Sequence, residues 1–525
     1  MRARRSLAVS FAALRCVLAL AGVSAMLRVV AAPARAATAA PIVEPAIGGS
    51  PWTAAEIATL DADLDAMLAA APALRGAHYG VYAIDTASGT QLYAHAAQEE
   101  FQPASTFKLV AGSAALDALG PAFRFHTTLE LASRPGAALP ALVLRAGGDP
   151  TLSAGDLTEA LESVPGPAFS AVYVDDSAFE RRPYPAGWTW DDFAQDYAPK
   201  LSAATLDENV VDVHVLPGAH VGDPAIVRAA AGRGVVVPSG ECNATIDSGV
   251  AIVARATTGA AGSDDTIDVA RGALECPEVV GSIPLGAPAE TVGAAVYSPL
   301  VAMHEALRGA IAARGFTIAP LATQAGSIEM QLRPPAGLVP VRVLWAHDSL
   351  PLGELLGPRF WIPSDNLFGE LLLEELGLSS GGRPGSTAKG IAHERNWLQS
   401  IGVDPATVTL ADGCGMSQYD RITPRDLVAI LQHDWAGPNR QLVLDSLPVG
   451  AARGTIEGIA GTPAAGRVFA KTGSMMHVRG LAGYLATVRH GAVTFAFNVD
   501  DWNGDYPALA TLRAQVLSRI VDDGP

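Results

Sequence analysis

The chain has 525 residues, 49% of them hydrophobic, and a formal net charge of −17 at neutral pH. That length exceeds what a single hydrophobic core usually organises, so two or three domains are expected. The acidic balance argues against nucleic acid as the main partner, because neutralising phosphate groups needs a basic surface.

The N-terminal segment predicts export. Three arginines among the first five residues precede an apolar run over residues 7–32, and Ala34-Arg35-Ala36 fits a signal-peptide cleavage site. Two further arginines interrupt the run and make it a poor permanent membrane span. Residues 1–36 are therefore expected to be a signal peptide of an exported, periplasmic or extracytoplasmic protein, with an uncleaved anchor as the alternative.

The segment after the leader predicts the start of an α/β domain over residues 41–125. Helical spacing of apolar residues spans 53–70, alternating residues indicate a hairpin of strands at 78–85 and 91–93, and a helix is expected at 105–119.

Residues 126–292 have a different character, with frequent glycine and proline between short β-like runs. These runs are 141–144, 171–174, 210–215 and 235–237. The pattern predicts an inserted β-rich region of two nested domains.

Helical and strand-like patterns return in residues 293–525, which are expected to complete the first domain. The helices are expected at 300–313, 366–376 and 506–521, and the strands at 480–488 and 493–499. The last helix has an apolar stripe typical of a core-facing helix rather than of a membrane anchor.

The mature chain would retain three cysteines. An oxidising compartment favours a disulfide between Cys242 and Cys276, which leaves Cys414 free. The alternative is three unpaired, buried cysteines.

The first chemical motif is Ser105-Thr106-Phe107-Lys108. Residues three apart share a helix face, so Lys108 can reach the hydroxyl of Ser105 and act as the base that activates it as a nucleophile. Taken alone, the pattern is equally typical of a capping serine followed by a surface lysine.

The second motif is Ser364-Asp365-Asn366, which opens a leucine-rich helix. Ser364 can pass a proton to a leaving amine, and Asn366 can hold both Lys108 and a substrate carbonyl. The alternative is ordinary helix capping.

The third motif is Lys471-Thr472-Gly473-Ser474. On a strand edge, Lys471 and Thr472 can bind a substrate carboxylate, and Gly473 allows close approach of the backbone. The Ser474 N–H, together with that of Ser105, would form an oxyanion hole. The alternative is a solvent-facing turn.

Three such motifs in this order form the signature of penicillin-binding proteins and class A β-lactamases. Further motifs resemble the low-molecular-mass class C penicillin-binding proteins, which are D-alanyl-D-alanine carboxypeptidases and endopeptidases. These motifs lie at 147–152, 174–179, 187–192, 297–299 and 412–417. The chain departs from the family at Cys414 and Met416, where Ser and Leu are usual, and at Ser474, where Thr is common.

The resemblance implies a penicilloyl-serine transferase or β-lactamase-like α/β (α+β) domain, with an antiparallel sheet flanked by helices and interrupted by the inserted domains. It also implies no metal and no organic cofactor, and as partners the peptides of peptidoglycan and β-lactams. The expected activity is cleavage of D-Ala-D-Ala ends or cross-links through an acyl-enzyme. The alternatives are a β-lactamase and a catalytically silent wall-binding protein of the same fold.

Overall fold

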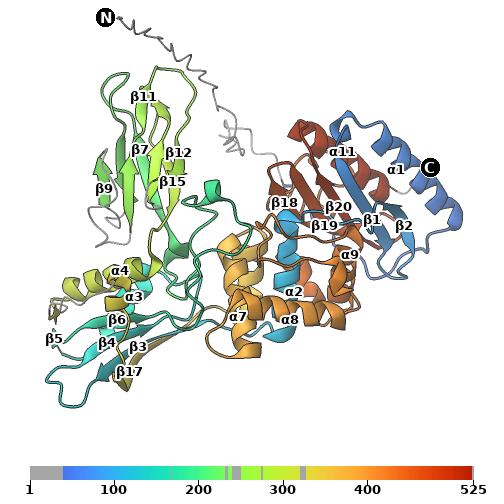
Figure 1. Ribbon diagram of the computed structural model, residues 1–525. Coiled ribbons are helices and arrows are strands. Elements are labelled where there is room, and N and C mark those ends of the chain that lie inside the picture. The colour runs from blue at the N-terminus through green and yellow to red at the C-terminus, as the bar shows by residue number, and fades with distance from the viewer. Residues whose placement is uncertain are drawn as a thin grey trace, which may run out of the picture. The chain divides into compact units, whose positions relative to one another are not determined.

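Figure 1 shows the computed structural model of the chain. The described residues are 39–166, 168–230, 235–238 (backbone path only), 250–272, 276–319 and 327–522. The expected signal peptide at 1–36 and Cys242 lie outside these ranges. Within them, no helix has both the length and the apolar character needed to cross a membrane.

A five-stranded sheet lies at the centre of the domain that carries the three motifs. Its strands in order are β18 (Val468–Met475), β19 (Val478–Ala486), β20 (Ala492–Asp500), β1 (His78–Asp85) and β2 (Gln91–His95). All neighbouring pairs are antiparallel, as expected for this fold class. Strand β1 is thus inserted between β2 and a strand from the far end of the chain.

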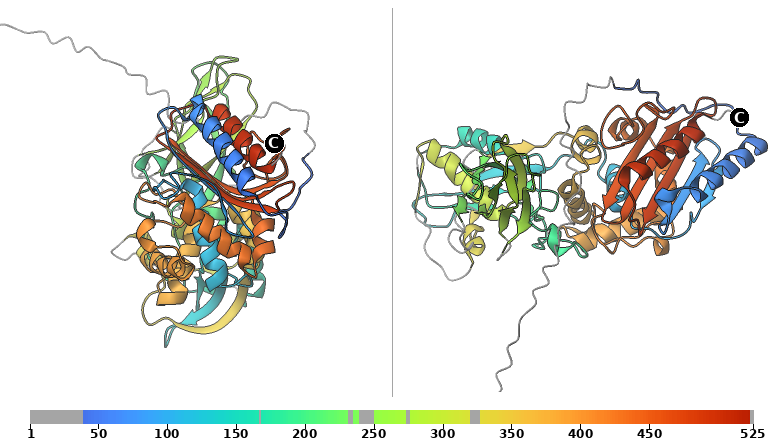
Figure 2. Two further views of the ribbon diagram at one scale, coloured as in Figure 1. Left: turned by 90° about the vertical axis from the view of Figure 1, so that its right-hand side faces the viewer. Right: turned by 90° about the horizontal axis from the view of Figure 1, so that it is seen from above.

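Side chains that alternate along β1 enter two separate cores, one on each face of the sheet. Val81 and Ala83 join the core of the outer face, whereas Tyr82 and Ile84 join that of the inner face. Helices α1 (Ala54–Ala69) and α11 (Tyr506–Val521) cover the outer face (Figure 2).

A layer of helices covers the inner face and carries two of the three motifs (Figure 1). It consists of α2 (Lys108–Ala118), α6 (Leu352–Leu355), the π-helical turn η9 (Leu356–Trp361), α7 (Asn366–Gly381), α8 (Thr387–Ser400), α9 (Pro424–Ala436) and α10 (Arg440–Ser446).

The inserted region contains a four-stranded sheet with a core of its own. The strands in order are β17 (Val339–Asp348), β3 (His126–Ser133), β4 (Ala141–Arg145) and β6 (Val172–Asp175). Helices α3 (Ala154–Ala160) and α4 (Pro299–Ala313) pack on it, and Leu144 and Leu307 are among its fully buried residues. The short α5 (Ile328–Leu332) and the strand pair β5 (Ala168–Phe169) and β16 (Thr317–Ile318) complete it.

A second set of strands within the insertion surrounds another core, which includes Val213, Ile252 and Val292. Its strands are β7 (Val210–Leu216), β8 (Ile226–Ala229), β9 (Val235–Pro238), β10 (Ala251–Ala254), β11 (Thr257–Gly259), β12 (Asp268–Arg271), β13 (Pro277–Val280), β14 (Ser282–Pro284) and β15 (Glu290–Ala295).

The helices and strands expected from the sequence start within two residues of their expected positions, except the helix expected at 105–119, whose α-helical part begins at Lys108 after a 3₁₀ turn. Strand β17, however, pairs with β3 of the inserted sheet over its whole length. We therefore propose that the inserted region extends to Asp348, beyond the boundary expected at residue 292.

Cys276 is disulfide-bonded. Its expected partner, Cys242, lies outside the described residues. Cys414 is a free, buried thiol.

Candidate active site

The Ser-x-x-Lys motif lies on a tight helical turn rather than on a regular α-helix. Residues Ala104–Phe107 form a 3₁₀ turn that leads into α2, and in such a turn residues three apart are eclipsed. The Nζ atom of Lys108 lies 2.8 Å from the Oγ atom of Ser105. Ser105 remains partly exposed, so a substrate can reach the hydroxyl that Lys108 contacts.

Lys108 is fully buried and has an acceptor for each of its three protons. Besides Ser105, Nζ donates to Asn366 Oδ1 at 2.6 Å and to the carbonyl oxygen of Cys414 at 2.9 Å. Burial lowers the pKa of Lys108, although the nearby acidic groups act in the opposite direction. A lysine with a lowered pKa can lose its proton and serve as a base.

The second motif combines capping with the chemistry expected of it. Asp365 caps α7 by accepting from the Phe368 N–H at 2.6 Å, as the capping alternative requires. Its neighbours are left free for other contacts: Ser364 Oγ accepts from Lys471 at 2.8 Å, and Asn366 contacts Lys108. Burial raises the pKa of Asp365 to about 6, partly offset by the Phe368 N–H.

The third motif lies on β18, the edge strand of the sheet. Lys471 is fully buried and donates to Ser364 Oγ and to the Thr472 carbonyl at 2.9 Å. Burial and then the charge of Lys108 hold the pKa of Lys471 well below its usual value. The Thr472 hydroxyl is 2.6 Å from that of Thr455.

Gly473 lets the edge strand approach the nucleophile. A Cβ atom at this position would lie 2.6 Å from the Pro103 carbonyl oxygen, closer than side chains tolerate, and 3.1 Å from the Ser105 nitrogen. The contact brings the backbone that precedes Ser474 next to the Ser105 N–H. Two backbone N–H groups on adjoining segments are the usual components of an oxyanion hole.

A fourth segment, residues 412–417, forms a turn that contacts Lys108 through the Cys414 carbonyl. The Asp412 carboxylate accepts from the backbone N–H groups of Cys414, Gly415 and Ser417 at 2.6 to 3.1 Å. It also accepts from Trp188 Nε1 at 2.9 Å. Together these bonds fix the turn that directs the Cys414 carbonyl at Lys108.

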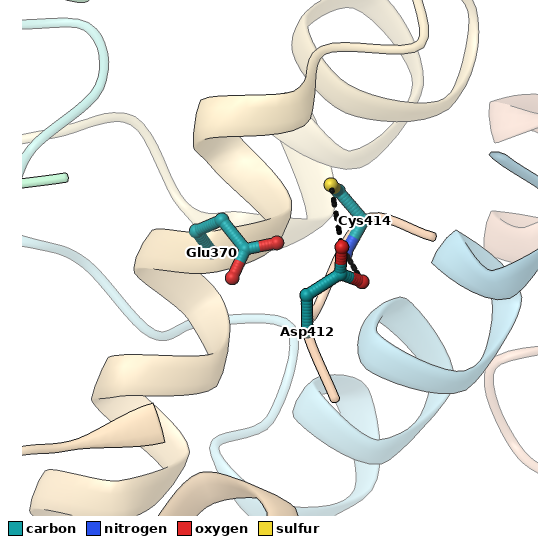
Figure 3. Close-up of side chains that lie close together, drawn as sticks. All are labelled: Glu370, Asp412 and Cys414. Atoms are coloured by element: carbon teal, nitrogen blue, oxygen red, sulfur yellow. Dashed lines mark hydrogen bonds between the residues drawn. The ribbon is translucent and has the colours of Figure 1, made fainter. Parts of the chain in front are cut away.

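Glu370 holds the same turn from α7 (Figure 3). It lies one helical turn after Asn366, and its Oε1 atom accepts from the Gly413 N–H at 2.9 Å. Burial and the nearby Asp412 raise its pKa well above the usual value. Burial likewise raises the pKa values of Glu394 and Asp420 well above their usual range, with the nearby Asp412 acting in the same direction on both.

One group of side chains in the described part of the chain has metal-ligand spacing: Glu370, Asp412 and Cys414, whose ligand atoms lie within 4.8 Å of one another. The Asp412 oxygens already accept four N–H groups, and Oδ2 is also 3.6 Å from the Cys414 sulfur. A carboxylate oxygen has two lone pairs, so these donors already occupy the lone pairs with which Asp412 would bind a metal ion. We do not propose a metal site here.

The inserted region contributes directly to the site. The Tyr197 carbonyl accepts from Asn366 Nδ2 at 2.8 Å, and Trp188 packs with Cys414 and Met416 in a small buried cluster. Sequence reasoning missed Tyr197, because the contact uses a backbone atom that any residue would supply. The sequence pattern around Asp412, an aspartate followed by glycines, indicated a turn. It did not indicate that the Asp412 carboxylate holds this turn together.

The structure thus brings together all eight candidate residues, from three motifs of which the first and the last are more than 350 residues apart in sequence. The fold and this arrangement define the class of penicilloyl-serine transferases, enzymes that transfer acyl groups through a serine.

Comparisons with known proteins agree and are more specific. The chain matches the D-Ala-D-Ala carboxypeptidase 3 (S13) family over residues 60–519, and it belongs to that family. It is 32% identical to the D-alanyl-D-alanine carboxypeptidase of an Actinomadura species, over 91% of this chain and 88% of that protein. With the D-alanyl-D-alanine carboxypeptidase DacB of Haemophilus influenzae the identity is 24%, over 79% and 83% of the two chains.

The crystal structure of penicillin binding protein 4 from Haemophilus influenzae has the same fold. It superposes with a TM-score of 0.72 at 21% identity and covers 87% of this chain and 99% of that one. The chain is accordingly a serine-type D-Ala-D-Ala carboxypeptidase, and neither a β-lactamase nor a silent binding protein is favoured.

Proposed function

We propose that Ser105 attacks the carbonyl carbon between two D-alanines and that Lys108 accepts its proton. The observation that carries this assignment is the 2.8 Å contact between the two side chains, with Lys108 buried and held on its other two sides. The bond from Ser105 Oγ to the carbonyl carbon forms first, and the C–N bond then breaks to leave an ester on Ser105.

The leaving amine needs a proton, and Ser364 is placed to supply it. Its hydroxyl contacts Lys471, while Asn366 connects Lys108 to the same motif. Lys108 can return the proton it took from Ser105, through Ser364, to the amine nitrogen. Water then hydrolyses the ester and regenerates Ser105.

Lys471, Thr472 and Gly473 are proposed to hold the substrate carboxylate along the edge of β18, with Ser474 and Ser105 N–H groups stabilising the oxyanion. The Thr472 hydroxyl, which contacts that of Thr455, would donate to the carboxylate in this scheme. The departure at Ser474 is harmless in this scheme, because its backbone N–H does the work.

The proposed substrates are peptidoglycan stem peptides ending in D-Ala-D-Ala, and cross-links in which the amine belongs to a second D-centre. The proposed location is outside the cytoplasmic membrane, after removal of residues 1–36. A β-lactam should acylate Ser105 because it presents a strained amide to the same groups. Support comes from the Haemophilus influenzae relative, which has been crystallised in complex with a β-lactam.

The experiment is to incubate the mature protein with a fluorescent penicillin and map the adduct by peptide mass spectrometry. We expect a slowly released adduct on Ser105 and none in a Ser105→Ala variant, with Ser133→Ala as a labelled control. A folded Ser105→Ala variant that still becomes labelled would overturn the assignment of the nucleophile. Rapid hydrolysis and release of the penicillin would instead favour the alternative that the protein is a β-lactamase.

A further inference from the structure

The free edge of strand β18, which carries the third motif, is covered along its first half by the connection between α10 and β18. The Ala470 N–H donates to the Pro448 carbonyl at 3.0 Å. The Gly450 N–H donates to the Val468 carbonyl at 2.9 Å. In the described part of the chain, no backbone hydrogen bond to this edge lies beyond Ala470. The open part of the edge therefore begins within the third motif itself.

The same connection places a hydroxyl group at the start of the open edge. The Oγ1 atom of Thr455 lies 2.6 Å from the Oγ1 atom of Thr472, which is the distance of a hydrogen bond between two hydroxyls. Thr455 is exposed and Thr472 is partly exposed, so solvent and a substrate can reach this pair. Within the described residues, neither hydroxyl has another hydrogen-bond partner.

The loop that presents Thr455 is held in place by hydrogen bonds of its own. Val449 and Arg453 exchange two backbone hydrogen bonds, of 2.8 and 2.9 Å. The Arg453 guanidinium donates to two backbone carbonyl oxygens at the end of α10, each at 3.0 Å. Gly454 has a φ of +85°, and a Cβ atom there would lie 2.9 Å from Pro448 Cβ, so this position requires glycine. The loop therefore fixes the position of the Thr455 hydroxyl without help from β18.

The direction of a single proton decides whether Thr472 can bind a carboxylate. A carboxylate only accepts hydrogen bonds, so Thr472 has to donate to it and can only accept from a third group. The Thr455 hydroxyl can be that group, because its own proton can point at Thr472 Oγ1. A hydroxyl that accepts a hydrogen bond also becomes a stronger donor.

Lys471 can supply only part of the binding to a carboxylate. Its Nζ atom is buried and already donates to Ser364 and to the Thr472 carbonyl, so two of its three protons are in use. Burial also lowers its pKa, which disfavours the charged form. Recognition of the carboxylate therefore depends strongly on the Thr472 hydroxyl.

We propose that Thr455 is a positioning residue for recognition of the C-terminal carboxylate of the substrate. Thr455 donates to Thr472, and Thr472 donates to the carboxylate. The inference rests on the proposed role of Thr472 and adds to it a residue that lies outside the three motifs.

The test measures kcat/KM for a synthetic, N-acetylated peptide that ends in D-Ala-D-Ala. Thr455→Val removes the hydroxyl at nearly constant size, and we expect it to lower kcat/KM by about five- to tenfold. Because Thr455 is exposed, the Tm should not change. Thr455→Ser restores the hydroxyl and should restore kcat/KM. Thr462→Val is the matched control: Thr462 lies later in the same connection, donates to the Ile459 carbonyl and should leave kcat/KM intact.

A double-mutant cycle shows whether Thr455 acts through Thr472. Once Thr472→Val has removed the donor to the carboxylate, adding Thr455→Val should cause little further loss. An equal loss from Thr455→Val in both backgrounds would contradict the proposal. So would an unchanged kcat/KM in Thr455→Val when Thr472→Val is impaired, and the proposed role of Thr472 would then still stand. If Thr472→Val itself leaves kcat/KM unchanged, that role fails and the inference fails with it.

Discussion

The two faces of the five-stranded sheet both bury cations, but they surround them differently. On the inner face, Lys108 has three acceptors and Lys471 has two. On the outer face, Arg513 is almost as deeply buried and two of its nitrogen atoms have no acceptor. The chemistry of the side chains distinguishes the two cases: a buried lysine can become a neutral base, whereas an arginine stays charged.

The largest effect is expected from removing the amine on the inner face. Lys108→Met keeps the length of the side chain but removes the proton acceptor, so penicillin acylation of Ser105 should slow by at least about 10³-fold. Lys389→Met is the control, because Lys389, on the first turn of α8, donates to the carbonyl oxygens of Gly382 and Pro384 in the connection between α7 and α8. Acylation within tenfold of the parent rate would mean that another group acts as the base.

The pH dependence of acylation tests whether Lys108 works as a neutral amine. Because burial lowers its pKa, the reactive form should be populated below the ordinary lysine pKa of 10.5. The rate constant for acylation should rise about tenfold per pH unit below that lowered pKa and level off above it. A rate that falls as the pH rises through this range would show that the ammonium form is the reactive one.

Asp412→Asn tests how far the position of Lys108 on the inner face depends on the turn formed by residues 412–417. The NH₂ group of the asparagine would face backbone N–H groups that now donate to the Asp412 carboxylate. Because two donors repel each other, the turn should shift and the Cys414 carbonyl should move away from Lys108. We expect a loss of about 10- to 100-fold in the acylation rate, as for other supporting groups, with a shifted pH profile. A variant that is only less stable would have a lower Tm but an unchanged pH profile of the acylation rate.

Asp420→Asn provides the comparison for that change. Asp420 is buried in the same cluster, and burial raises its pKa well above the usual value, which favours the neutral carboxyl. The amide should therefore replace it with much less effect on the rate.

The smallest effect is expected for Glu370→Gln. Burial raises the pKa of the Glu370 carboxyl well above its usual value, which favours the neutral form, and glutamine retains an oxygen that can accept from the Gly413 N–H. Acylation at pH 7 should change by no more than about threefold. A loss as large as that of Asp412→Asn would show that the inner face depends on a charged Glu370 rather than on its shape.

The side chains of the active site were predictable because each lies in a short local pattern. Ser105 and Lys108 are three residues apart on one turn, and Asp365 caps the helix that presents Asn366. The fold class and the positions of most strands and helices followed from apolar periodicity. These features depend on local sequence alone.

The rest depends on contacts that leave little trace in the sequence. The carbonyls of Cys414 and Tyr197 are supplied by the backbone, so no residue type announces them. Strand β17 pairs with β3 roughly two hundred residues earlier, and apolar alternation does not name a partner. In the sequence, Arg513 is one basic residue of an amphipathic helix, and only the packing of α11 in the structure shows that it is buried.

The pairing of β1 with β20 has a consequence for when the enzyme becomes active. Tyr82 lies opposite Ala496, so the strand next to the nucleophile turn has to wait for more than four hundred further residues before its neighbour exists. The β3–β4 and β7–β8 strand pairs of the inserted sheets close through much shorter connections, so we expect them to form first. We therefore expect the catalytic serine pocket to be completed last, once the C-terminal strands are available to pair with β1.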